Sequence, residues 1–245
     1  MKNIFMSHKS IRKYRPDPVS DLLLNEILES GSRASTTGNM QVYSIIVNRD
    51  PVIKKKLWEV HFGQDMVIEA PVHITFCADF NRFNTWCRLR HADPGYNNYL
   101  SFFTAAIDAL LVSQNVCLAA EERGLGICYL GTATYNADKI IDILELPEGV
   151  VPVAAIVMGY TAEDPPVSPR LPMEAVVHYE KYRDFTSDRI DKIYRERESS
   201  DQTKELLKIN EKETLAQIYT DKRYTRKDNE YFSEKFFETI KRQGF

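Results

Sequence analysis

Apolar positions along the chain recur at spacings typical of short helices and strands. Leucine and isoleucine at three-to-four spacing over residues 23–28 predict one buried helix face, with Ser20 as the N-cap and the helix ending near Gly31. Short runs rich in β-branched residues predict strands at 42–47, 72–78, 127–130 and 151–158, and further helices are expected at 3–8, 51–70 and 137–144. Strands interleaved with helices in this order predict a three-layer fold with a central sheet.

The longest predicted helix spans residues 99–123 and is apolar over much of its circumference. It should therefore lie centrally in the fold or at a subunit interface, and Gly124 and Gly126 follow its end. The segment before it, residues 80–98, is rich in Asn, Asp, Arg and aromatic residues. This composition predicts a long polar connection.

The C-terminal part of the chain differs in composition from the rest. Of the 61 residues from Phe185 onward, 27 are charged, 14 of them positive and 13 negative. Sparse apolar positions with balanced charges predict solvated surface helices rather than an arm that binds nucleic acid. We therefore expect a body at residues 1–182 and a charged helical extension at 183–245 that packs on the body or on a partner subunit.

The overall composition, 43% apolar and 27% charged, is that of an ordinary globular protein. A net charge of −3 provides no basic field for nucleic acid. No apolar run approaches the roughly 20 residues of a membrane span, and the N-terminus carries no signal-like apolar segment, so we expect a cytoplasmic protein. The four cysteines show no zinc-site or C-x-x-C spacing and are expected to be buried and reduced.

Four polar clusters are candidates for chemistry. Residues 7–12 combine basic side chains with two hydroxyls, a set that can hold a phosphate or can form a basic surface turn. Residues 35–41 offer donors and acceptors to a flat heterocycle, although the same residue types form ordinary turns. Residues 126–134 end a strand in small residues that let a ligand approach the backbone, and the proline-rich residues 165–172 can hold one arginine in a fixed place.

The sequence contains none of the motifs we sought for catalysis without an organic cofactor. The spacings of a serine nucleophile, a zinc protease, a P-loop or an EF-hand do not occur, and the five histidines are scattered, so no metal site is expected. His73, inside a predicted strand, is expected to be a satisfied core residue. If the protein is an enzyme, a bound cofactor would supply the reactivity, and the chain would supply placement and charge.

Taken in order, these clusters resemble the flavin-dependent nitroreductase family, specifically its oxygen-insensitive NADPH nitroreductase and flavin reductase branch. The similarity is carried by six segments, residues 8–12, 35–41, 77–82, 124–126, 129–131 and 169–172. It extends over about residues 5–182 and weakens through the charged tail. Several motifs in the right order are far more specific than any one alone.

The resemblance implies an α+β fold whose central, mostly antiparallel sheet is flanked by helices in three layers. It also implies a homodimer with one FMN in each of two clefts at the subunit interface, NAD(P)H as co-substrate and a small aromatic acceptor. The residues it implies for FMN binding are His8, Lys9, Ser10, Arg12, Thr36, Thr37, Asn39, Gln41, Gln64, Gly131, Thr132 and Arg170.

The same resemblance implies a role for each group of these residues. The phosphate and ribityl chain would be held by His8, Lys9, Ser10 and Arg170. Arg12 would lie near N1 and O2 of the ring, where a cation stabilises the anionic reduced flavin, and the amide of Gly131 or Thr132 would point at N5. Hydrogen bonds to the ring and ribityl would come from Asn39, Gln41 and Gln64, with Thr36 and Thr37 reaching across from the partner subunit.

Two departures from the branch leave parts of this interpretation open. Ser168 stands where the branch usually carries lysine, which removes one charge partner of the phosphate. The tail residues Arg223, Arg226 and Lys227 align only loosely with those that select the 2′-phosphate of NADPH, so the coenzyme preference is open. The physiological acceptor is open too.

The implied reaction is a ping-pong hydride transfer from NAD(P)H through flavin N5 to a nitroaromatic, a quinone or free flavin. No side chain needs to act as an acid, because solvent can supply protons to an open cleft. Two alternatives remain: a flavoenzyme of the same fold with a dedicated reaction, such as dehalogenation or flavin breakdown, and a flavin-binding dimer without catalytic activity.

Overall fold

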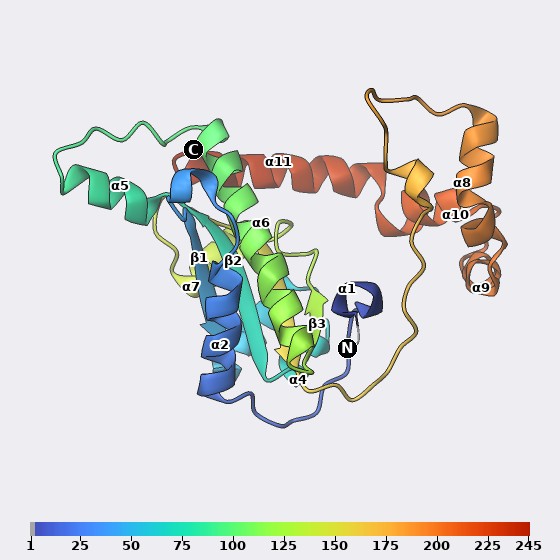
Figure 1. Cartoon of the computed structure of the whole chain (residues 1–245), viewed down its shortest axis with the longest axis horizontal. Coiled ribbons are helices and arrows are strands. Elements are labelled where there is room, and N and C mark those ends of the chain that lie inside the picture. Colours follow the sequence, from blue (N-terminus) through green and yellow to red (C-terminus); the bar gives the residue numbers. More distant parts are fainter. Residues whose placement is uncertain (1–2) are drawn as a thin grey trace. The chain divides into compact units, whose positions relative to one another are not determined.

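A computed structural model describes residues 3–245 and has an antiparallel sheet at its centre (Figure 1). The sheet has four strands in the order β1-β2-β4-β3, with antiparallel pairing throughout. The strands are β1 (Tyr43–Asn48), β2 (Val72–Asp79), β3 (Gly126–Tyr129) and β4 (Val150–Gly159). The predicted strands and the predicted antiparallel α+β architecture are therefore confirmed.

Helices fill most of the remaining chain. The longer ones are α2 (Asp21–Ser32), α3 (Pro51–Val60), α5 (Asn81–Arg88), α6 (Tyr99–Glu122), α7 (Ala137–Leu144), α8 (Ser187–Ser199), α9 (Asp201–Asn210) and α11 (Arg226–Arg242). Single turns are α1 (Ile4–Ser7), η1 (Thr37–Asn39), α4 (Met66–Glu69), η2 (Met173–Ala175), α10 (Leu215–Ile218) and η3 (Tyr219–Arg223). Ser20 caps α2 as predicted, because its side chain accepts the Leu23 N–H.

Two helical layers enclose the sheet. On one face, α2 and α6 pack against alternate residues of β2, among them Ile74 and Phe76. On the other face, α3, α4 and α7 pack against Cys128, Ala155 and Val157. Because both faces are covered, every residue of β2 is buried. The three predicted layers are confirmed.

The central helix α6 is long and apolar. By length and composition it is able to cross a membrane, with a mean hydropathy of 1.5 over one window, and 56% of that window is buried inside the protein. No such segment was predicted from the sequence, because a few polar side chains, Asp108 among them, interrupt the apolar run. In the structure the buried part of α6 packs on α2 and the sheet, as predicted for a central helix.

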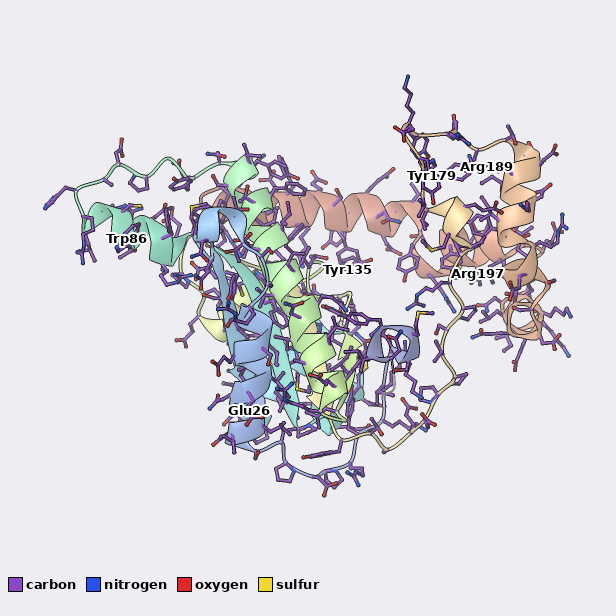
Figure 2. The ribbon with its side chains drawn as sticks, in the orientation of Figure 1. Glu26, Trp86, Tyr135, Tyr179, Arg189 and Arg197 are labelled. Atoms are coloured by element: carbon purple, nitrogen blue, oxygen red, sulfur yellow. The ribbon has the colours of Figure 1, made fainter. Side chains whose placement is uncertain are left out.

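The segment at residues 80–98 differs from the predicted polar connection. Its first half is the helix α5, on which Trp86 is exposed (Figure 2). The remainder is held to the body by Tyr96, whose ring stacks on Phe80 at 4.9 Å. Aromatic residues at three-residue spacing, Phe80, Phe83 and Trp86, explain the helix, because they line one side of it and contact one another. The four cysteines are free and buried, as expected.

The chain divides into two compact units whose limits differ from the predicted boundary at residue 182. One comprises the residues up to Val167 together with Phe232–Phe245, and the other comprises Ser168–Tyr231. Residues 168–182 belong to the second unit because they contact α8: Arg189 donates to the Glu174 carbonyl at 3.1 Å. The end of the chain returns to the body, where Phe245 packs against α6 residue Phe102 at 5.7 Å.

Gly31 allows α2 and α6 to approach closely, and this leads to a first prediction. A Cβ at Gly31 would lie well inside contact distance of Val116 Cγ2, a fully buried atom of α6. Alanine favours helix by about 1 kcal/mol over glycine, but overpacking costs about 1–3 kcal/mol. We therefore expect Gly31→Ala to lower the free energy of unfolding by up to about 2 kcal/mol in urea denaturation.

The matched control for this change is Gly95→Ala, since the structure places nothing within 4 Å of a Cβ at Gly95 among residues 3–245. That variant should unfold at nearly the same urea concentration as the unmodified protein. If the Gly31→Ala protein is at least as stable as the unmodified one, α2 and α6 can move apart enough to accommodate the methyl group without loss of stability.

Candidate active site

The first candidate segment, residues 8–12, lies along the edge strand β3. Ser10 forms a parallel β-bridge with Ile127, and the Ile11 N–H donates to the Ile127 carbonyl at 2.9 Å. The approach requires glycine at position 126, because a Cβ there would lie 2.7 Å from Ile11 Cγ1. This contact fixes the place of the basic residues on either side of Ile11.

Arg12 presents a cation near β3. Its side chain is exposed, while its backbone N–H donates to Glu163 Oε1 at 2.6 Å. Burial raises the pKa of the Cys128 thiol on β3, and the charge of Arg12 acts on the same thiol in the opposite direction. Because Arg12 directly follows Ile11, whose N–H donates to the Ile127 carbonyl, this exposed cation belongs to the segment that lies along β3.

His8 and Lys9 each face a carboxylate. His8 Nδ1 lies 2.8 Å from Glu121 Oε1, and Lys9 Nζ forms an ion pair with Asp164 and donates to the Pro165 carbonyl at 3.0 Å. Lys9, Glu121 and Asp164 line a cavity of about 590 Å³. Neither acidic partner was predicted, because both lie more than 100 residues away along the chain and no local sequence pattern indicates them.

The second candidate segment is the turn that follows β3. Gly131 is exposed, and apart from its two chain neighbours no described residue comes within 4 Å of where its Cβ would be. The Thr132 hydroxyl lies 2.7 Å from His61 Nδ1 and 3.4 Å from Gln64 Nε2, which also donates to the His61 carbonyl at 2.9 Å. The structure thus brings together three predicted site residues and adds His61, which had not been singled out.

His61 and His73 form a fully buried pair, with their Nε2 atoms 3.3 Å apart. Burial lowers the pKa of His61 to about 4. Burial, and then the charges of His61 and Lys54, lower the pKa of His73 to about 3. Both rings are therefore neutral at neutral pH.

The expectation that His73 is a satisfied core residue is half right. It is fully buried in β2, but within residues 3–245 its Nδ1 has no hydrogen-bond partner. The contact with His61 uses Nε2 and leaves the other ring nitrogen buried without a partner.

The third candidate segment, the loop at residues 36–41, is attached to the middle of α6. The Thr37 N–H donates to Asp108 Oδ1 at 2.9 Å, and this aspartate is 1% exposed. Asn39 and Gln41 adopt left-handed conformations with φ of 55° and 54°. Both side chains are exposed, and Gln41 Nε2 lies 3.4 Å from Asn39 Oδ1.

This loop and the N-terminal segment lie far apart within one chain. Their anchors, Asp108 and Glu121, are 13 residues apart in α6, which is about 20 Å at 1.5 Å per residue. In Figure 1 the loop between α2 and β1 lies at one end of α6, whereas α1 lies beside the other half. The structure of one chain therefore does not unite the candidate residues at 36–41 with those at 8–12.

Arg170 lies in the second compact unit. It lines a cavity of about 260 Å³ together with Ser168, Arg197 (Figure 2) and Arg223. Several guanidinium groups around one cavity suit an anionic group. The implied contact of Arg170 with a flavin phosphate stays a prediction.

Comparison with known proteins places this arrangement in a family. The family model described as "Nitroreductase family" matches residues 5–160. An NADPH-dependent oxidoreductase of Staphylococcus saprophyticus is 35% identical over 188 residues, which cover 74% of this chain and 73% of the relative. A crystal structure of a Bacteroides fragilis protein is 50% identical, with a TM-score of 0.97 over 99% of this chain and 98% of that one.

A further solved structure carries information about cofactors. The NADPH:FMN oxidoreductase of Vibrio harveyi, solved in complex with NAD+, is 27% identical, with a TM-score of 0.81 over 97% of this chain and 96% of that one. The family match covers more than half of the chain, and the fold agrees over nearly its full length. The chain therefore belongs to the nitroreductase family and is an NAD(P)H-dependent oxidoreductase.

Proposed function

We propose that the protein is an FMN-dependent oxidoreductase that passes a hydride from NAD(P)H to flat, electron-poor acceptors, namely nitroaromatics, quinones or free flavin, in a ping-pong cycle. The observation that carries this proposal is the turn after β3. It presents bare backbone at Gly131 beside the hydroxyl of Thr132 and the carboxamide of Gln64. FMN and NADPH also appear in the name of the Vibrio harveyi relative.

The residues around this turn fit the ring of a flavin. A planar heterocycle can lie against the backbone at Gly131, because no side chain fills that space in the described chain. Hydroxyl and carboxamide groups match the donors and acceptors along a flavin edge. Arg12 adds an exposed cation near the same strand.

The phosphate of FMN can bind Lys9 if it replaces the carboxylate that is paired with this lysine. Lys9 is paired with Asp164, whose side chain is 91% exposed, so solvent screens this ion pair. A phosphate dianion is a stronger partner for Lys9 than a solvated carboxylate. His8 is held by Glu121, which is mostly buried, and we propose that His8 keeps that contact and offers its other ring nitrogen.

Bound FMN would supply the redox chemistry, by taking up a hydride at N5 and releasing it to the acceptor. The chain's own contribution is placement and charge. The Arg12 guanidinium favours negative charge on the ring, and the backbone at Gly131 and Thr132 orients the reactive edge. Solvent supplies protons to the open site, so no side-chain acid is required.

This proposal predicts a yellow protein that loses its visible flavin absorbance on anaerobic addition of NADPH or NADH. Reoxidation by a nitroaromatic, a quinone and free flavin, each in turn, then identifies the acceptor class. Colourless protein that takes up no added FMN would exclude the proposal. Tight flavin binding with slow reduction by both nicotinamides would favour a binding protein without catalytic activity.

We further propose that the site is completed by a second copy of the chain. The side of α6 that faces away from the sheet carries five exposed apolar residues, Leu100, Phe103, Ile107, Leu110 and Leu111. Their spacing puts them on one stripe, and such stripes are usually covered by a partner. A second copy packed on this stripe can bring its loop at residues 36–41 toward the segment at residues 8–12, from which that loop is distant within one chain.

Leu110→Lys should therefore convert a dimer into a monomer and weaken FMN binding by at least about tenfold, since a buried charge at an interface costs several kcal/mol. Analytical ultracentrifugation and FMN titration measure the two effects. Leu22→Lys, at an exposed leucine of α2, is the control and should change neither. An unmodified protein that sediments as a monomer and still binds FMN would contradict the proposal.

A further inference from the structure

A line of polar groups runs from the candidate site into the core. Gln64 Nε2 lies 3.4 Å from Thr132 Oγ1, which lies 2.7 Å from His61 Nδ1. His61 Nε2 in turn lies 3.3 Å from Nε2 of His73. Elsewhere the interior of this unit is mainly apolar, so two facing imidazoles need a reason.

We propose that His61 and His73 are positioning residues that make the Thr132 hydroxyl a hydrogen-bond donor to the bound ligand. This inference rests on the proposed function, because it names how the same site would hold its flavin. It concerns the direction of each hydrogen bond, which follows from the chemistry of the groups.

Two neutral imidazoles that face each other through Nε2 share one proton between those atoms. If His61 Nε2 carries this proton, His61 Nδ1 carries none, and the Thr132 hydroxyl must donate to His61 Nδ1. If His73 carries it, the proton of His61 sits on Nδ1 and is donated to Thr132. The second arrangement leaves the Thr132 hydroxyl proton free for a ligand.

The environment of His73 decides between the two arrangements. Its Nδ1 is buried and has no partner in the part of the chain that the structure describes. In the first arrangement this nitrogen would be an unpaired N–H, whereas in the second it is an unpaired acceptor. Orphaned buried N–H groups are the rarer and costlier case, so the proton belongs on His73 Nε2.

Gln64 supports the same direction. Its Nε2 amide donates to the His61 carbonyl at 2.9 Å and points at Thr132 Oγ1. With His61 Nδ1–H as a second donor, both lone pairs of the Thr132 oxygen are engaged. The hydroxyl proton must then be donated elsewhere, and it makes no hydrogen bond to another group among residues 3–245.

The proposed direction of the hydrogen bonds requires both imidazole rings to be neutral, and the groups around the rings favour the neutral form. The charged group acting on His73 is Lys54, whose ammonium donates to the carbonyls of Ile68 and Ala70. The other groups facing the pair, Thr132 and Gln64, are uncharged. A positive neighbour and burial both oppose protonation of the imidazoles.

The direct test is the tautomeric state of both histidines in the flavin-free protein, read by nitrogen NMR of the imidazole rings at neutral pH. We expect His61 to carry its proton on Nδ1 and His73 on Nε2. The opposite pair of tautomers would overturn the inference. This measurement needs no flavin, so it stands even if the protein binds none and the proposed function fails.

The second test is FMN affinity, measured by fluorescence titration, together with the midpoint potential of the bound flavin. Thr132→Val and His61→Leu should each raise the Kd by about tenfold, the loss expected for one hydrogen bond. His61→Asn, whose amide N–H can replace Nδ1–H, should restore most of the affinity.

The matched control is Thr134→Val, at a half-buried threonine of the same turn. It should leave both the Kd and the potential unchanged. If Thr132→Val also leaves both unchanged, the hydroxyl is not a donor to the ligand and the inference is overturned. Thermal unfolding of each variant identifies any that loses FMN through loss of the fold.

Discussion

Gly131→Val is expected to weaken FMN binding by about 10- to 100-fold while leaving the fold intact. The new side chain meets no described protein atom within 4 Å of its Cβ, so the chain itself is not crowded. It occupies the space through which a flat ring would reach the backbone, and overpacking of this kind costs about 1–3 kcal/mol. Fluorescence titration of the flavin-free protein measures the Kd, and thermal unfolding checks the fold.

The control for this change is Gly95→Val, another exposed glycine with open space around its Cβ. It should bind FMN as the unmodified protein does. If Gly131→Val also binds FMN with unchanged affinity, the ring does not lie against this turn. The site would then have to be sought elsewhere, for example in the cavity beside Lys9.

Local signals explain why much of the fold was predictable from sequence. Ser20 caps α2 through a contact three residues away, and each strand is a short apolar run whose ends are marked by polar residues, glycine or proline. The mostly antiparallel character of the sheet was implied by the family resemblance, and the order of its strands was not predicted, because a local pattern does not show which strands pair. The helix α5 was missed, since its polar composition hid the aromatic spacing of Phe83 and Trp86.

The candidate site was predictable in its residue types but not in its pairings. Gln64, Gly131 and Thr132 do come together. The carboxylates that face His8 and Lys9 come from distant positions, and nothing local to them signals a role.

His61 was missed for a related reason. Its contact with His73 exists only in the folded protein, where the end of α3 packs next to β2. Contacts of this kind depend on tertiary packing, so a single sequence does not reveal them.

The buried histidine pair also makes stability depend on pH, and this is the second large effect. In the folded protein the pKa of His61 is about 4 and that of His73 about 3, both below the ordinary 6.5 of the unfolded chain. Between these values and 6.5 the unfolded state binds more protons, so acid favours unfolding. The stability is fully present above pH 6.5 and is lost as the pH falls through this window.

Urea denaturation at a series of pH values should therefore show a free energy of unfolding that falls by on the order of a few kcal/mol from pH 6.5 to 4. A double variant, His61→Gln with His73→Leu, removes both buried imidazoles and should show a shallower fall, because this pair then no longer takes up protons on unfolding. His91→Asn is the control. It removes an exposed histidine whose left-handed backbone, with φ of 61°, asparagine tolerates, and it should reproduce the unmodified curve. Equal slopes for the double variant and the unmodified protein would show that the pair binds protons in the folded state as readily as in the unfolded chain, so that burial does not keep these two rings neutral in acid.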